Sequence, residues 1–150
     1  MVGLMNRSID LLERMAADSG NIFGLNRRGY LFVTGDQERF HQMIEQAHHV
    51  STLGAGPVRL HPGPIPYRHS PDEGFSGTPE GADVLVGPTE VREHFPFVSE
   101  RAAGAIHVRR AGWFSAQQLG AWMLERARER GLELKCPRSE RSSRWRRLPL

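Results

Sequence analysis

Apolar residues near the start of the chain recur at the spacing of an α-helix. Charged residues occupy the positions between them, and Ser19-Gly20 follows, where glycine accepts the left-handed conformation that ends helices. The pattern predicts an amphipathic helix over residues 5–18. Its apolar face consists of Met5, Ile9, Leu12 and Met15 or Ala16.

The pattern then changes to that of a strand. Residues 30–34 are mainly aromatic and β-branched and follow the turn residues 26–29, so they predict a strand. Asp36 is a favourable N-cap for a second helix. The apolar face of that helix carries Phe40, Met43, Ile44 and Ala47.

Regular patterns stop between residues 54 and 81. Six prolines in this span exclude a regular helix. The sequence predicts a long irregular loop with one short extended piece at 58–60. A loop of this length inside a compact domain indicates a functional segment or a chain that is part of something larger.

Short elements are predicted again after residue 81. Strands are expected at 84–86 and 105–109, and a brief helix is expected from Pro88 to Phe95 between them. The predicted elements together indicate an α+β or α/β fold class.

The clearest helix is predicted over residues 115–130. Ser115 and Gln118 have the spacing of a capping box, and Gly131 ends the pattern. Residues 132–134 then begin an extended segment, as in the second half of a crossover unit. The apolar stripe of the helix contains Ala116, Leu119, Met123 and Ala127.

The charge of the chain is unevenly distributed. The 150 residues carry 20 basic and 17 acidic side chains, a net charge of +3. Residues 1–134 carry a net charge of −2, and residues 135–150 carry +5. We therefore divide the chain into a domain at 1–134 and a basic tail at 135–150. The body gives no electrostatic reason to expect a nucleic-acid partner.

The tail has two interpretations. It is either an arginine-rich arm for RNA or phosphate, with Trp145 available for stacking, or a disordered or out-of-frame sequence. We favour the second, because the body has no basic face that would extend such an arm.

Cysteine content and hydropathy bear on the location of the protein. Cys136 is the only cysteine, so the chain forms no intramolecular disulfide, and a reducing cytoplasmic setting is expected. No apolar stretch has the length of a membrane span, and the first ten residues lack the pattern of a signal peptide.

Candidate chemistry is sparse. Gly54-Ala55-Gly56 begins like a dinucleotide fingerprint, but prolines follow where the helix should start, so we interpret it as a loop. His41, His48 and His49 lack ligand spacing and are interpreted as solvated helix residues, so no metal site is expected. Catalytic residues cannot be assigned.

The only substrate-pocket candidates are His107 and Arg109. They alternate on one face of the predicted strand, which is the arrangement for lining a pocket for an anionic substrate. A solvated sheet face is the alternative, and it is the interpretation that we favour.

Several runs spread over residues 5–134 point to one family when taken together. They are Asn6 to Leu12, Gly20-Asn21, Leu25 to Leu31, Leu53 to Gly56, Pro88 to Pro96 and Arg110 to Gly131. In this order they resemble FAD-dependent oxidoreductases of the D-amino-acid oxidase, glycine oxidase and sarcosine oxidase superfamily.

The resemblance implies part of a Rossmann-type FAD domain together with part of an antiparallel substrate-domain sheet. It also implies FAD as cofactor and oxidation of an amine, amino acid or hydroxy acid by hydride transfer to the flavin. The family's N-terminal Gly-x-Gly-x-x-Gly segment has no counterpart here. We therefore expect an internal fragment that is inactive alone, and no flavin-binding residue is carried over.

Two other interpretations remain open at this stage. One is a small non-enzymatic binding module whose arginine-rich tail binds RNA or anionic partners. The other is a separately encoded subunit that completes a flavin site with a partner chain. A chain cut from a larger enzyme would also expose apolar surface, such as the Leu119 and Met123 stripe, and be poorly soluble.

Overall fold

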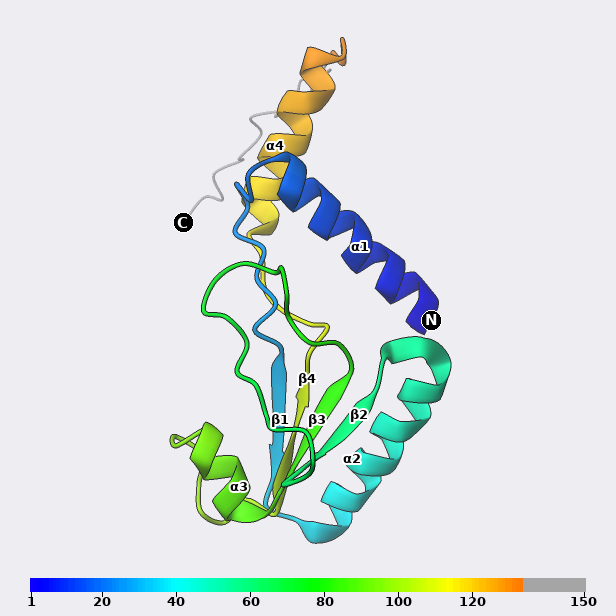
Figure 1. Cartoon of the computed structure of the whole chain (residues 1–150). Coiled ribbons are helices and arrows are strands. Elements are labelled where there is room, and N and C mark those ends of the chain that lie inside the picture. The colour runs from blue at the N-terminus through cyan, green and yellow to red at the C-terminus, as the bar shows by residue number, and fades with distance from the viewer. Residues whose placement is uncertain (134–150) are drawn as a thin grey trace, which may run out of the picture.

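The computed structural model describes residues 1–133, with helices and strands in a mixed order (Figure 1). The elements are α1 (Val2–Asp18), β1 (Tyr30–Thr34), α2 (Gln37–Val50), the π-helical turn η1 (Ser51–Ala55), β2 (Val58–His61), β3 (Ala82–Val86), α3 (Gly87–His94), β4 (Gly104–Val108) and α4 (Ala116–Glu129).

The strands form one mixed sheet in the order β1-β4-β3-β2. β4 pairs antiparallel with both β1 and β3, and β2 joins the edge of β3 in parallel. The predicted α+β fold class is confirmed, and the fold is consistent with part of the domain that the resemblance implies. The expected antiparallel pairing holds for β1, β4 and β3. It does not hold for β2, which pairs with β3 in parallel.

Local capping explains where two helices begin. Asp36 accepts a hydrogen bond from the backbone N–H of Arg39 at 2.9 Å, and Ser115 accepts one from Gln118 at 3.3 Å. Both N-caps were predicted from the sequence, because short oxygen-bearing side chains satisfy N–H groups left free in the first turn.

One face of the sheet packs against α2. Phe40 is buried there against Val84 and Ile106, and α2 lies along this face in Figure 1. Gly104 is required at this contact, because a Cβ atom would lie 2.1 Å from the Phe40 ring. This apolar layer is the larger core of the sheet.

The opposite face is covered by α3 and by an irregular segment. Leu85, Val91 and Ala105 form a small buried cluster on this side. Residues 62–79, which we call the strap, run from β2 back across this face toward β3 (Figure 1). The predicted proline-rich loop is thus confirmed, with β2 as its extended piece.

The ends of the described chain form a third cluster away from the sheet. Ala16, Phe23 and Leu25 are buried between α1 and the start of α4. Figure 1 shows α4 running past the end of α1, and the helix has no buried residue. Met123 is 51% exposed, as predicted for the Leu119 and Met123 stripe. The prediction is wrong for Leu119, which packs against this cluster.

Some predictions fall at or beyond the end of the described residues. Residues 132 and 133 belong to no strand, and Leu134 lies outside the described part, so the predicted extended segment is not tested further. The predictions for the tail at 135–150 and for Cys136 also lie outside it. Among residues 1–133, no helix combines the length and apolar character needed to cross a membrane.

Candidate functional site

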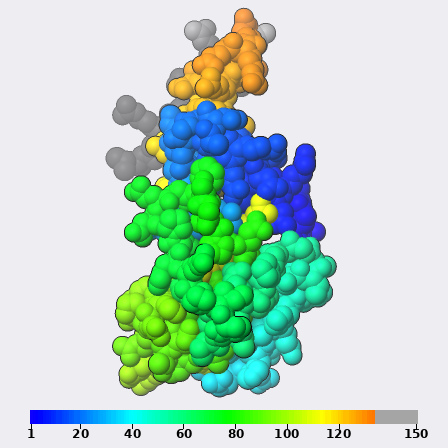
Figure 2. All heavy atoms as spheres, viewed as in Figure 1, coloured from blue at the N-terminus to red at the C-terminus, as the bar shows by residue number. Residues whose placement is uncertain are grey.

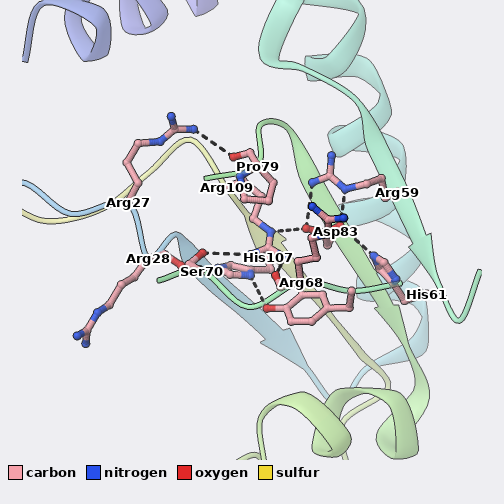
Figure 3. A network of polar contacts seen from close by, with 11 residues as sticks. Arg27, Arg28, Arg59, His61, Arg68, Ser70, Pro79, Asp83, His107 and Arg109 are labelled. Atoms are coloured by element: carbon pink, nitrogen blue, oxygen red, sulfur yellow. Dashed lines mark hydrogen bonds and ion pairs between the residues drawn. The ribbon is translucent and has the colours of Figure 1, made fainter. Parts of the chain in front are cut away.

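A single buried carboxylate organises the strap face of the sheet. Asp83, the second residue of β3, is 2% exposed. Its carboxylate accepts hydrogen bonds from Arg59 Nε at 2.6 Å and Nη2 at 3.0 Å. The His61 ring nitrogen Nε2 lies 2.9 Å from the same carboxylate (Figure 3). Arg59 is the register partner of Asp83 on β2, so pairing of the two strands places these charges together.

Arg109 completes the network from the end of β4. Its Nε donates to Asp83, and its side chain is 1% exposed. The other guanidinium nitrogens donate to the strap, to Ser70 Oγ at 3.1 Å and to the carbonyl of Arg68. Asp83 and Arg109 therefore tie the strap to the sheet.

Asp83 keeps its charge because of its hydrogen-bond donors. Burial alone would raise the pKa of Asp83, but hydrogen bonds from Arg59, His61 and Arg109 outweigh burial and hold it well below its usual range. Asp83 is thus ionised at neutral pH. A buried carboxylate with these donors is satisfied as an acceptor, which is the condition for keeping a charge inside a protein.

Tyr67 fixes the strap above this network. Its ring stacks on His94 with centroids 4.4 Å apart, and the Arg109 guanidinium lies 4.5 Å from the ring centroid. Its hydroxyl lies 2.8 Å from Nδ1 of His107. Burial raises the pKa of Tyr67 to about 12, although the nearby Arg109 opposes this shift. The hydroxyl therefore stays protonated and acts as a donor.

His107 has both ring nitrogens engaged. Nε2 lies 2.7 Å from the carbonyl of Arg28, and because a carbonyl only accepts, Nε2 carries the hydrogen. Nδ1 then accepts from Tyr67. Burial and the charge of Arg109 lower the pKa of His107 to about 4, so the ring is neutral at pH 7. Gly29 permits this approach, since a Cβ there would lie 2.2 Å from Nε2.

A cavity of about 540 Å³ opens beside this arrangement. It lies between the strap, β1 and the end of α3; in Figure 2 the green strap covers the surface between α1, in blue, and α3, in yellow-green. Its volume is that of a small-molecule site. Its lining includes Arg28, Leu31, Tyr67, His94, Phe97 and His107.

Comparison with known families identifies the class of protein. The family model of FAD dependent oxidoreductases (DAO) matches residues 1–143. The chain belongs to this family. No curated protein and no solved structure matches the chain. The family match extends past Leu134, where we placed the end of the resemblance.

The structure corrects our interpretation of the two pocket candidates in this oxidoreductase chain. His107 and Arg109 are 4% and 1% exposed, so the solvated sheet face that we favoured is wrong. The strap, which no periodicity placed, covers them. His107 lines the cavity, whereas Arg109 lies beneath Tyr67 with its donors used inside the protein. Contact of either residue with a substrate stays a prediction.

Asp83, Arg59 and His61 were not predicted from the sequence. One signal was present, because Asp83 interrupts the otherwise apolar run from Ala82 to Val86. A charge within such a run indicates a buried ion pair. Arg59 and His61 alternate in the same way on β2, but their pairing with β3 was not visible from the sequence.

The family's cofactor does not fit the glycine run of the described residues. Gly54 to Gly56 follows α2 and leads into β2, whereas a dinucleotide site needs a strand before the glycines and a helix after them. Gly56 instead packs on Gly81, where a Cβ would lie 2.8 Å from the backbone nitrogen. The loop interpretation is confirmed, and no step involving flavin is derived from these residues.

The histidines of α2 are solvent-facing, as predicted. His41, His48 and His49 are all exposed. Within residues 1–133, no group of three or more His, Cys, Asp or Glu side chains is arranged to hold a metal ion.

Proposed function

We propose that this chain supplies the substrate-binding side of an FAD-dependent oxidoreductase that oxidises an amine, an amino acid or a hydroxy acid. The observation that carries the proposal is the strap-face cavity of about 540 Å³, in a chain whose family is shown. The cavity is mixed in character, since apolar residues such as Leu31 and Phe97 line it together with the polar side chains of Arg28, His94 and His107.

The residues of the cavity have separable roles in this proposal. Leu31 and Phe97 supply apolar surface for contact with a bound molecule. Arg28, whose Nε and Nη2 donate to the Asp72 carbonyl, is the cation at the cavity for a carboxylate. His107 is not a general base in this state, because both of its nitrogens are engaged. It holds Tyr67, and with it the strap, in place.

We further propose that the chain does not bind FAD or turn over substrate alone. In the family the flavin accepts the hydride, and the protein supplies position and electrostatics. The geometry of Gly54 to Gly56 supports this, since it offers no helix N-terminus to a pyrophosphate. A partner chain that carries the dinucleotide motif would complete the flavin site.

Two measurements test these proposals separately. Flavin absorbance of the purified chain, with FAD added and then removed by dialysis, should show no stoichiometric flavin, and a stoichiometric value would contradict the statement about FAD. NMR titration with benzylamine, phenylalanine and phenyllactate should shift the ring signals of His69, His94 and His107. His41 and His48 on α2 serve as control signals.

A cavity variant makes the titration specific. Phe97→Ala shortens one wall of the cavity, and Phe97 is 81% exposed, so the fold should tolerate the change. We expect weaker ligand shifts in this variant and unchanged shifts in Leu60→Ala, which alters the far edge of the sheet. Ligand-induced shifts of the same size in Phe97→Ala and Leu60→Ala would contradict the proposed site. Shifts confined to the α2 histidines would contradict it as well.

A further inference from the structure

The two edges of the sheet are protected to different degrees. β2 has only four residues, carries Arg59 and lies between Pro57 and Pro62. Proline and charge on a short strand are common means of preventing edge-to-edge pairing. β1 forms the other edge and contains only Tyr, Leu, Phe, Val and Thr. It has none of these protections.

β1 presents both a free backbone edge and apolar side chains. Tyr30, Phe32 and Val33 are 55%, 52% and 42% exposed. The backbone hydrogen bonds described for this strand run to β4 and, from Ala103, to the carbonyl of Thr34. Among the described residues nothing pairs with the outer side of the strand. An extended segment is the partner that such an edge accepts.

The sequence around β1 is complementary to itself. In an antiparallel pair centred on Phe32, Leu31 lies opposite Val33, and Tyr30 lies opposite Thr34. No like charges face each other within the strand, and apolar or β-branched residues meet at every position. A two-fold axis through Phe32 repeats each of these contacts, as in an isologous dimer.

Charge complementarity extends the same register beyond the strand. Arg28 lies opposite Asp36 of the second copy, and the two-fold axis makes this pair twice. Both residues are exposed, and Asp36 keeps its capping bond to Arg39 while its carboxylate faces solvent. Neither residue forms an ion pair within residues 1–133. Arg28 donates from Nε and Nη2 to the Asp72 carbonyl, which leaves Nη1 for the second copy.

We propose that β1 pairs antiparallel with β1 of a second copy of this chain, centred on Phe32, so that one sheet runs through the dimer. A second copy is favoured over another extended segment because apolar and charged positions match in a single register. The proposal goes beyond the proposed function, although Arg28 and Leu31 also line the strap-face cavity. Sedimentation without any ligand tests it separately.

Sedimentation equilibrium of the whole chain over a range of concentrations tests the dimer. We expect a reversible monomer–dimer equilibrium for the natural sequence. Phe32→Lys places two like charges opposite each other on the axis and should abolish the dimer. Leu60→Lys, at a 54% exposed position on the β2 edge, is the matched control and should leave the dimer intact.

The charge pairs fix the register. Arg28→Glu places a carboxylate opposite Asp36 twice and should raise the dimer dissociation constant about tenfold. Adding Asp36→Asn, which retains an N-cap oxygen, removes that repulsion and should recover much of the loss. No recovery in the double variant would overturn the proposed register.

Three results would overturn the pairing itself. They are a monomer at all concentrations, a dimer unaffected by Phe32→Lys, and equal loss of the dimer in Phe32→Lys and Leu60→Lys. Circular dichroism confirms that each variant is folded. If Phe32→Lys does not fold, Val33→Lys at the neighbouring exposed position replaces it with the same expected result.

Discussion

The two faces of the sheet are built from neighbouring residues of the same strands, yet they are held together differently. Val84 and Ile106 face α2 and pack on Phe40 in an apolar core. Asp83 and His107, one position away on each strand, face the strap and carry buried polar groups. A regular helix covers the first face, and an irregular segment covers the second.

The difference shows what an irregular cover requires. α2 satisfies its own backbone and needs only an apolar stripe to pack on the sheet. The strap has no such internal pattern, so side chains from the sheet must hold it. Arg109 binds the carbonyl of Arg68 and the hydroxyl of Ser70, and Asp83 holds Arg109. On the polar face, ion pairs and hydrogen bonds rather than apolar packing hold the strap, which forms one wall of the cavity.

Asp83→Asn tests the polar face with the largest expected effect. It removes the charge that holds Arg59 and Arg109 and leaves buried guanidinium groups without compensation. We expect a loss of about 3–5 kcal/mol in the free energy of unfolding. Urea denaturation measures it. A loss below about 1 kcal/mol would mean that the network adds little to stability.

Ile106→Ala is the corresponding change on the apolar face. Ile106 is 4% exposed and contacts the α2 core. Lost burial and the resulting cavity should cost about 2–4 kcal/mol by the same denaturation measurement. The cost should be independent of pH between 4 and 7, because the contact involves no titratable group. A pH-dependent cost would show that the two faces are coupled.

A pH series on the natural chain tests His107. Its pKa is about 4 in the folded protein and about 6.5 in the unfolded chain. Between these values the unfolded chain binds the additional proton, so stability should fall as pH drops from 6.5 to 4, by up to about 3 kcal/mol. Denaturation of His107→Gln is the control and should show a smaller slope. An equal slope would assign it to another group.

Tyr67→Phe tests the contact between strap and sheet with a smaller effect. The ring can still stack on His94, but Nδ1 of His107 loses its donor. We expect a loss of about 0.5–1.5 kcal/mol in unfolding free energy. A thermal shift larger than that of Ile106→Ala would contradict this ranking.

Met123→Gln is the smallest change in the series. Met123 is 51% exposed on α4, outside both faces of the sheet. Unfolding free energy should change by less than about 0.5 kcal/mol. Solubility, measured as the saturating concentration, should rise because an exposed apolar group is removed. A loss of stability would show that this part of α4 packs against the protein.

The sequence predicts the elements with local signals well. β1, α2 and α4 follow from apolar spacing and from Asp36 and Ser115 as caps, and these signals lie within each segment. The start of α1 was placed at Met5, whereas the helix begins at Val2. Local patterns identify an element better than they fix its ends.

The candidate site depends on contacts that no local pattern contains. Asp83 meets Arg59 only through parallel pairing of strands that the proline-rich strap separates. His107 and Arg109 were interpreted as part of a solvated sheet face because the strap that covers them has no helical or strand periodicity in its sequence. Alternation gives the face of a side chain and does not reveal what lies over it. Buried charges inside short strands are therefore the better signal for such a site.

Trypsin cleavage after Arg68 is the most direct test of the central claim, that Asp83 and Arg109 hold the strap in place. The Arg68 carbonyl is bound by Arg109, so cleavage in the natural chain should be slow. We expect much faster cleavage at this bond in Asp83→Asn, at a rate that changes little when a low concentration of urea is added. Ile106→Ala should show no selective increase at this bond. If Asp83→Asn does not fold, Arg109→Lys takes its place. Equal acceleration in the polar-face and apolar-face variants, or none in either, would contradict the claim.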